Sequence, residues 1–371
     1  MSGIYIHIPF CHQKCNYCNF HLSTCLNLKN EVLKAIVEEI KMRKEYLKNE
    51  ALDTIYFGGG TPSLLSIKEI EDILKTIFLT FKTSPTPEIT LEANPIDLTE
   101  EKTCSLKTIG INRLSIGVQT FNETFLKFLN RQETSKNIYS AINNVVKYGF
   151  KNFNIDLIFA IPGQKKEDLM ADIEKLIAIH PTHISTYCLT IEEKTVLDFW
   201  IKKGITKKVD DDLAADFFLI IDEILTSEGY EHYEISNYCL NGFKAIHNSN
   251  YWNGKMYLGI GPSAHSYNLI SRQYNVENNL EYIKYIKNGE IPANVEILTE
   301  KDKTNEYIFT HLRTSNGINV RILDEKYKYQ INEDFIEEMK KQNLITKNGD
   351  VLTLTTKGML IADEIIKNLL L

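Results

Sequence analysis

The sequence predicts an α/β protein with a partial (β/α)6 barrel, then a smaller α+β region and a C-terminal winged-helix-like module. Strand-like and helical patterns alternate over the first half of the chain, which indicates a parallel sheet with right-handed crossovers. The alternation stops near residue 195 after six units, too few to close a full barrel of about eight strands. A helix, helix, strand, helix pattern then ends the chain, an order typical of a winged-helix module.

The elements of the first half follow from local patterns taken in order. The strand-like runs cover residues 3–10, 54–57, 88–92, 113–117, 154–159 and 183–188. Apolar residues recur at helical spacing between them, first at Val32, Leu33, Ile36, Val37 and Ile40. Ser66 and Glu69 form a capping box that predicts the start of the next helix.

The chain divides into three predicted domains. Residues 1–195 form the barrel core, 196–295 an extension that carries a helix at 210–225 and an extended segment at 230–238, and 296–371 the C-terminal module. Thr299 and Asp302 predict the first helix of that module. Its second helix is acidic, with Glu333, Asp334, Glu337 and Glu338. The module is therefore interpreted as a structural or docking unit that does not read DNA.

Composition limits the classes of protein to which this chain can belong. The chain has 371 residues, 43% hydrophobic and 25% charged, with a net charge of −7, which argues against a nucleic-acid partner. No run of about eighteen apolar residues predicts a membrane span, and the first residues lack the pattern of a signal peptide. Seven cysteines, an odd number, favour a reducing compartment over a disulfide framework. We expect a cytoplasmic protein.

Cysteines gather in one short loop after the first strand. Cys11, Cys15 and Cys18 have the spacing C-x3-C-x2-C, and three thiolates from one loop suit three irons of a cubane [4Fe–4S] cluster. The fourth iron is then open to another ligand. The alternative is a zinc site completed by His21 or Cys25, but the remaining cysteines form no second pair of the usual kind.

Several motifs together resemble one family. They are Tyr5-Ile-His-Ile-Pro-Phe-Cys11, Phe57-Gly-Gly-Gly-Thr-Pro62, Leu91-Glu-Ala-Asn-Pro95, Ser115-Ile-Gly-Val-Gln119, Asn130-Arg131 and Asp156-Leu-Ile-Phe. The whole chain is similar to the radical S-adenosylmethionine (SAM) family of oxygen-independent coproporphyrinogen III oxidases and their relatives. The resemblance implies that cofactors sit at the carboxyl ends of the strands.

The resemblance also implies a set of SAM-binding residues. They are Tyr5, Gly59, Gly60, Thr61, Glu92, Gln119, Arg131, Asp156 and Ile158. Residues 58–60 lack side chains, so we expect their backbone amides to approach the amino-acid part of SAM. Arg131 is the expected partner of the SAM carboxylate, and Ile158 is expected to pack on the adenine.

Two departures from the oxidase pattern favour a particular branch. The oxidase has a fourth cysteine two residues after the third, where this chain has Phe20, and it has a long leading segment where this chain begins ten residues before Cys11. Both features resemble the HemW-type haem chaperones. His247-Asn-Ser-Asn-Tyr-Trp252 resembles their haem-binding motif, so His247 is the expected haem ligand and His265 the second choice.

The predicted function is therefore that of a haem chaperone that carries a [4Fe–4S] cluster and SAM and passes haem to acceptor haem proteins such as respiratory enzymes. Transient contact with a membrane protein and oligomer formation are further expectations. Two alternatives stay open at this point: a coproporphyrinogen III oxidase, and a zinc-stabilised docking protein.

Overall fold

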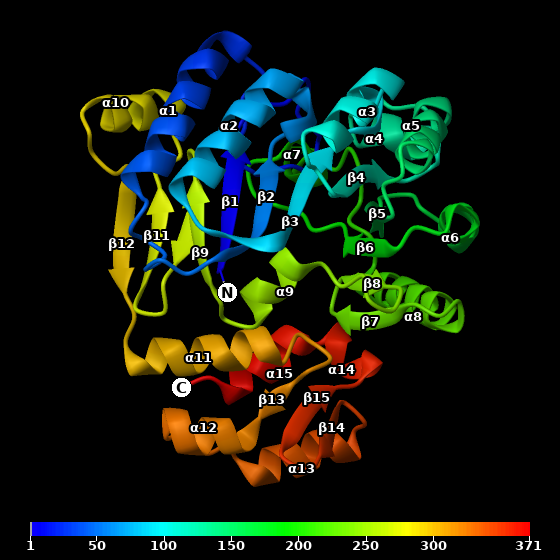
Figure 1. The fold of residues 1–371 in the computed structure, drawn as a ribbon. Coiled ribbons are helices and arrows are strands. Elements are labelled where there is room, and N and C mark those ends of the chain that lie inside the picture. Colours follow the sequence, from blue (N-terminus) through cyan, green and yellow to red (C-terminus); the bar gives the residue numbers. More distant parts are fainter. Residues whose placement is uncertain (1) are drawn as a thin grey trace.

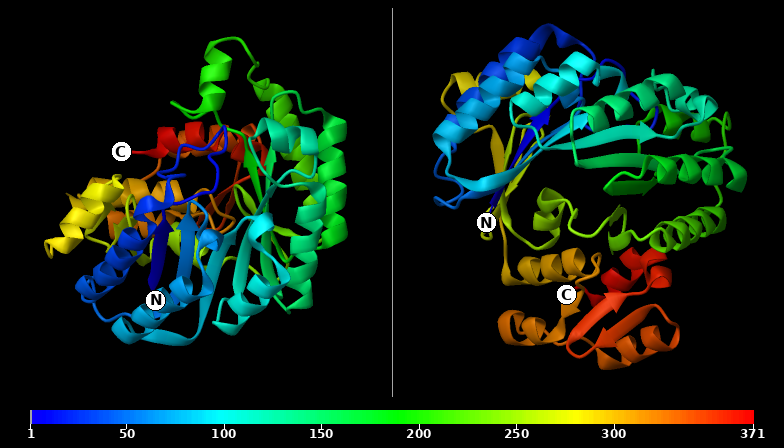
Figure 2. Two further views of the ribbon diagram at one scale, coloured as in Figure 1. Left: turned by 90° about the horizontal axis from the view of Figure 1, so that it is seen from above. Right: turned by 45° about the vertical axis from the view of Figure 1, so that its right-hand side comes forward.

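A computed structural model, which describes residues 2–371, has twelve strands in one sheet with helices on its outer face (Figure 1). The first six strands are parallel and adjacent in chain order: β1 (Ser2–Ile8), β2 (Leu52–Gly59), β3 (Thr83–Ala93), β4 (Arg113–Gln119), β5 (Asn152–Phe159) and β6 (His183–Cys188). They curve into an open arc (Figure 2). The predicted (β/α)6 unit is confirmed.

Helices cover the convex side of this arc (Figure 2). They are α1 (Lys29–Met42), α2 (Ile67–Thr80), α3 (Glu100–Thr108), α4 (Glu123–Phe128), α5 (Ser135–Lys147) and α6 (Lys166–Ile179), with short 3-10 turns η1 (Leu26–Leu28), η2 (Pro62–Leu64) and η3 (Pro95–Asp97). The capping box of Ser66 and Glu69 is present at the start of α2. It satisfies amide groups that the first helical turn leaves without partners.

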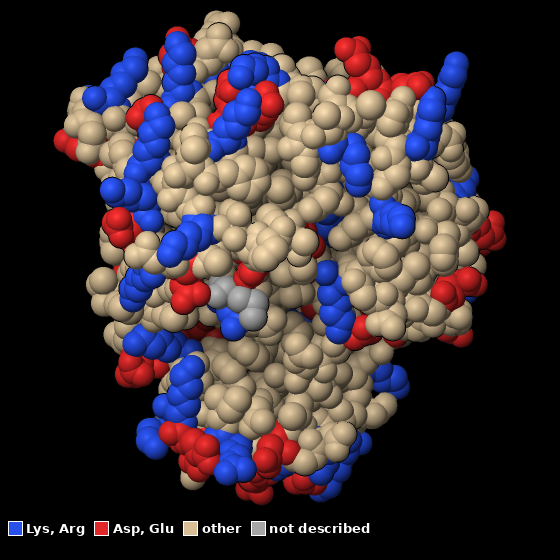
Figure 3. Space-filling view, viewed as in Figure 1, with Lys and Arg blue, Asp and Glu red and all other residues tan. Residues whose placement is uncertain are grey.

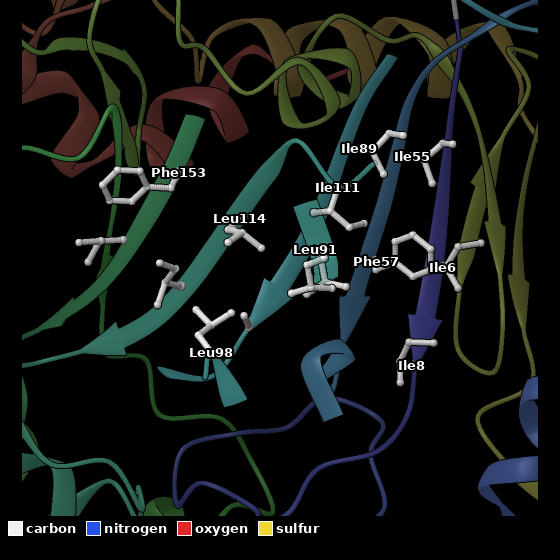
Figure 4. Packing of buried hydrophobic residues seen from close by; sticks show 14 of the residues in the cluster. Ile6, Ile8, Ile55, Phe57, Ile89, Leu91, Leu98, Ile111, Leu114 and Phe153 are labelled. Carbon is white, nitrogen blue, oxygen red and sulfur yellow. The ribbon is translucent and has the colours of Figure 1, made fainter. Parts of the chain in front are cut away.

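Side chains alternate along each strand, and this alternation separates the core from the site. One set, which includes Ile6, Ile55 and Leu91, is fully buried in the main hydrophobic cluster (Figure 4). The other set is polar, for example Thr90 and Arg113, and the alternation turns it toward the concave side. The interior of the arc is therefore polar even where water is excluded.

Residues 196–295 extend the same sheet at both edges. The elements are α7 (Val196–Lys202), α8 (Asp211–Ser227), β7 (Glu231–Glu234), β8 (Asn237–Cys239), α9 (Ile246–Trp252), β9 (Met256–Ile260), β10 (His265–Tyr267), β11 (Ser271–Asn275), α10 (Asn279–Lys287) and β12 (Ala293–Ile297). Strand β8 pairs antiparallel with β6, whereas β9 pairs parallel with β1. The segment predicted as extended, 230–238, is the β7–β8 hairpin.

The C-terminal part has its own small sheet and hydrophobic cluster. Its elements are α11 (Glu300–His311), β13 (Ile318–Asn319), α12 (Val320–Tyr327), α13 (Glu333–Lys341), β14 (Ile345–Asn348), β15 (Val351–Leu354), α14 (Thr356–Leu360) and α15 (Ala362–Leu369). The predicted capping box of Thr299 and Asp302 is present. The winged-helix-like assignment and the domain boundaries stay predictions.

Two backbone hydrogen bonds tie this part to the large sheet. Ile235 donates to the carbonyl of Arg313 at 3.1 Å, and Ser315 donates to the carbonyl of Tyr233 at 2.9 Å. These bonds fix the segment that follows α11 beside the β7–β8 hairpin.

Charged side chains of both signs are interspersed across the face shown in Figure 3. This distribution differs from the clustered Lys and Arg of a nucleic-acid surface.

Within residues 2–371, no helix combines the length and apolarity that crossing a bilayer requires.

A buried carboxylate joins the first helix to the strands of the second half. Glu39 on α1 is fully buried and accepts hydrogen bonds from the Tyr282 hydroxyl at 2.6 Å, the Asn275 amide at 2.8 Å and the backbone of Gly261 at 2.9 Å. Its partner charge is Arg43, 3.3 Å away and also buried. Removing one member of such a pair leaves an uncompensated charge in the core.

We therefore expect Glu39→Ala to lower the free energy of unfolding by about 3–5 kcal/mol, measured by equilibrium urea denaturation. Glu38→Ala is the matched control, because Glu38 is 56% exposed and pairs with Lys41 on the surface; its loss should cost about 1 kcal/mol or less. Equal effects of the two substitutions would contradict this role of Glu39.

Candidate functional site

The site is a cavity of about 1260 Å³ on the concave side of the sheet. Most of the residues predicted from the sequence line it: Cys11, Cys15, Cys18, Gly59, Gly60, Thr61, Glu92, Gln119, Arg131, Asp156 and Ile158. Tyr5 and His247 are not among its lining residues. The C-terminal part also lines it, through Arg313 and residues 359–364. Seen from above, the C-terminal helices lie behind the N-terminal loop (Figure 2).

The cysteine loop is held by backbone contacts on both sides. The amide of Cys11 donates to Ser23 at 3.1 Å, and the amide of Asn16 donates to the carbonyl of Leu129 at 3.1 Å. All seven cysteines of the chain are free. Among the described residues, no three His, Cys, Asp or Glu side chains form a group suited to a single metal ion. In a cubane cluster each thiolate binds a different iron.

Glycine is required where the loop after β2 meets the loop after β1. A Cβ on Gly60 would lie 2.6 Å from the carbonyl oxygen of Phe10. The amide of Gly60 donates to Ile8 at 2.8 Å, and that of Gly59 donates to Glu92 at 3.1 Å. Both amides are used within the protein in this structure, and SAM binding by Gly59 and Gly60 stays a prediction.

Thr61 follows these glycines and touches the cysteine loop directly. Its amide donates to Phe10 at 2.7 Å, and its hydroxyl donates to the sulfur of Cys11 at 3.2 Å. Burial raises the pKa of Cys11 to about 11, and the Thr61 hydrogen bond opposes this rise. The free thiol is protonated at neutral pH, so a metal must displace its proton.

Arg131 places a fixed cation beside the cysteine loop. Its guanidinium donates to the carbonyl of Gly117 at 2.5 Å and lies 3.1 Å from the carboxylate of Glu133. One terminal nitrogen lies 3.8 Å from the sulfur of Cys15. Burial opposes the charged form, but Tyr17, Cys15 and Glu133 raise the pKa of Arg131 above its ordinary value. The side chain stays charged next to the thiols.

Two partly buried carboxyl groups line the same cavity. Glu92 accepts a hydrogen bond from the Tyr56 hydroxyl at 2.8 Å. Burial raises the pKa of Glu92 to about 7, and nearby Asp156 adds to the rise. Burial also raises the pKa of Asp156, although Ser185 and Asn154 donate hydrogen bonds to it. Such groups can accept hydrogen bonds from the hydroxyl groups of a bound ligand.

His247 lies in the polar interior of the barrel and is 2% exposed. Its Nδ1 shares a hydrogen bond with the Thr54 hydroxyl at 2.7 Å, and its Nε2 shares one with the Tyr251 hydroxyl at 2.8 Å. The ring stacks on Tyr56 at 4.9 Å between centroids. Burial lowers the pKa of His247 to about 3, so the imidazole is neutral. Both nitrogens are engaged, and ligation of an iron would require one of them to be released.

Tyr5 and His265 also lie outside the cavity lining. Tyr5 stacks on Tyr56 at 6.0 Å, and its hydroxyl bonds His7 at 3.2 Å, so it supports the wall that carries Glu92. His265 on β10 packs near Tyr274, with ring centroids 6.0 Å apart.

Comparison with known proteins identifies the family. The model of the radical SAM superfamily matches residues 5–176. The heme chaperone HemW of Lactococcus lactis is 34% identical over 373 residues, covering 100% of this chain and 97% of that protein. HemW of Bacillus subtilis is 32% identical over 371 residues, with 98% of each chain covered. The chain belongs to the HemW family of radical SAM proteins.

A solved structure agrees with this family at the level of fold. Coproporphyrinogen III oxidase (HemN) from Escherichia coli, described as a radical SAM enzyme, superposes with a TM-score of 0.85 over 99% of this chain and 89% of that one. The sequence identity is 22%, so the likeness shows the shared fold alone.

The residues of this HemW-family chain fit a [4Fe–4S] cluster. Three free thiols on one loop reach a common cavity, which is the donor set such a cluster takes. Arg131 offsets the negative charge of the bound thiolates. Phe20, where the oxidase pattern has a fourth cysteine, lines the same cavity and is 66% exposed.

We expect anaerobically reconstituted protein to hold about four irons per chain, and Cys11→Ala, Cys15→Ala or Cys18→Ala to abolish cluster absorbance. Cys25→Ala, Cys104→Ala and Cys239→Ala are controls that should leave it unchanged. Iron content and visible absorbance measure the effect. Stoichiometric zinc without iron–sulfur absorbance would contradict the assignment.

Glu92 predicts a pH-dependent stability. The pKa of Glu92 is about 7 in the folded chain against an ordinary value of 4.5, so the folded chain binds more protons between these values. The protonated Glu92 carboxyl therefore contributes to the free energy of unfolding below pH 4.5, and this contribution is lost as the pH rises through about 7.

Glu92→Gln, which stays neutral, should stabilise the metal-free protein at pH 8 by about 3 kcal/mol and should change little at pH 4. Urea denaturation at both pH values measures this. Glu101→Gln, an exposed carboxylate on α3, serves as control and should show no such difference. A Glu92→Gln effect that is the same at both pH values would disprove the burial argument.

Proposed function

We propose that this protein is a haem chaperone that binds haem, passes it to acceptor haem proteins, and carries a [4Fe–4S] cluster and SAM. The observation that carries the proposal is similarity over nearly the full length to proteins named heme chaperone HemW. The residue at position 20 supports the same branch, because Phe20 has no thiol to offer an iron.

The cluster is proposed to bind through Cys11, Cys15 and Cys18. A bound cluster supplies an iron that can take the amine and carboxylate of SAM. Thr61 orients the sulfur of Cys11 through its hydroxyl, and Arg131 is held in place by Glu133 beside Cys15. These contacts hold the Thr61 hydroxyl and the Arg131 guanidinium beside the thiols.

SAM is proposed to lie on the polar wall of the cavity. Glu92 and Asp156 can accept hydrogen bonds from ribose hydroxyl groups, and Ile158 offers an apolar contact for adenine. Gln119 lines the same cavity. Its backbone φ of 70° lies in the left-handed region, at the end of β4 where the chain turns toward α4. Arg131, whose Nη1 lies 3.8 Å from the sulfur of Cys15, is the proposed carboxylate partner.

His247 stays a predicted haem ligand, with His265 as the second choice. Ligation by His247 would separate its imidazole from Thr54 or Tyr251. The proposed function does not depend on either residue, because it concerns haem binding by the whole chain.

Acceptor haem proteins, a cytoplasmic location, oligomer formation and transient contact with a membrane protein are further proposals. The seven free cysteines agree with a reducing compartment.

The rival is a coproporphyrinogen III oxidase, which the fold permits. We expect reconstituted protein to bind haem with a Soret band and to show negligible conversion of coproporphyrinogen III with SAM and a reductant. Absorbance titration and product chromatography on one preparation measure both. An authentic oxidase in the same assay is the positive control.

Sustained conversion of coproporphyrinogen would overturn the chaperone proposal. So would the absence of a Soret band in protein whose iron content is complete, because that protein would have its cluster but no cargo.

A further inference from the structure

The cavity exceeds the volume that one small ligand needs. Pockets for a single drug-sized ligand measure about 300–1,000 Å³, whereas this cavity measures about 1260 Å³. The proposed cluster and SAM residues lie around the cysteine loop and the ends of β2 to β5. The β7–β8 hairpin and the C-terminal part supply a separate surface, made of Ile235, Ser236, Arg313 and residues 359–364, which we call the module wall.

Residues 359–362 form an apolar stretch of the module wall. Leu360 and Ile361 are 37% and 42% exposed, high values for large aliphatic side chains that line a cavity. Tyr187 and Leu189, at and just after the end of β6, line the same cavity. Apolar and aromatic surfaces of this kind suit a flat macrocycle.

One cation belongs to this wall. In the described part of the chain, the basic side chains that line the cavity are Arg131 and Arg313. Arg131 is held next to Cys15, whereas Arg313 has a buried Nε that finds no hydrogen-bond partner within residues 2–371. The ring of Phe309 lies 4.3 Å from its guanidinium carbon. The Arg313 carbonyl accepts from the Ile235 amide at 3.1 Å, which fixes the backbone at this point.

The present partner of Arg313 is easily displaced. Its Nη2 forms an ion pair with Asp363, whose side chain is 84% exposed. Exposed ion pairs contribute about 0–1 kcal/mol. A carboxylate brought in by a ligand can therefore take the place of Asp363 at small cost.

We propose that haem lies against the module wall, with its macrocycle between Leu360–Ile361 and Tyr187–Leu189 and one propionate on Arg313. Asp363 holds Arg313 until the propionate replaces it. Met359 and Cys188 line the same cavity, and thioether and thiolate sulfur are among the ligands of haem iron. This inference rests on the proposed function, because it places the cargo that the function requires.

The placement predicts effects of opposite sign at two residues in contact. Arg313→Ala should weaken ferric haem binding about tenfold, because the propionate loses a charge-assisted partner. Asp363→Asn should tighten binding about two- to fivefold, because a competing carboxylate is removed. Dissociation constants from Soret titration of the reconstituted full-length chain measure both. Asp363→Asn alters an exposed side chain and keeps its size, so the test survives if Arg313→Ala folds poorly.

The matched control is Arg321→Ala, which breaks an exposed pair with Glu325 on α12, outside the cavity lining. It should leave haem affinity unchanged. Wild-type affinity in both Arg313→Ala and Asp363→Asn would overturn the placement while the proposed function stands. Altered haem affinity in His247→Gln alone would reject the placement on the module wall and assign the haem site to α9. Absence of haem binding by the wild-type chain would instead reject the proposed function.

Discussion

The position of the cysteine loop depends on one close backbone contact between the loops that follow β1 and β2. Gly60 and Thr61 donate to the carbonyls of Ile8 and Phe10, and a Cβ on Gly60 would not fit in the space between them. This contact brings the Thr61 hydroxyl to the sulfur of Cys11. The parallel pairing of β1 and β2 fixes the end of β1, from which the cysteine loop begins. The glycines therefore serve the geometry of the metal site before they serve any ligand.

Local patterns were sufficient for the strands β1 to β6, whereas the SAM-binding residues that line the cavity were expected from the family resemblance. These residues sit in or directly after strands, and parallel strands bring their carboxyl ends to one edge. The sequence did not predict that β9 pairs with β1, because residues such as Tyr5 and Gly259 meet across a long stretch of chain. The burial of His247 could not be predicted for the same reason. Its partner Thr54 lies 193 positions away, so no local pattern distinguishes a buried imidazole from an exposed one.

The C-terminal part was missed as a wall of the cavity for a related reason. Its own sequence predicts helices and a small hydrophobic core, but nothing in it predicts contact with β6 or the β7–β8 hairpin. Two backbone hydrogen bonds to that hairpin bring Arg313 to the cavity. The cavity therefore has one cation near the thiols and another on the module wall, an arrangement suited to two different anionic ligands.

The central claim is that one cavity holds both the cluster and the haem. The most direct measurement is a crystal structure of the anaerobically reconstituted chain loaded with haem. We expect a porphyrin against Leu360 and Ile361, with a propionate on Arg313 and the cluster on Cys11, Cys15 and Cys18. A porphyrin bound at α9, with His247 on its iron and the module wall empty, would contradict it.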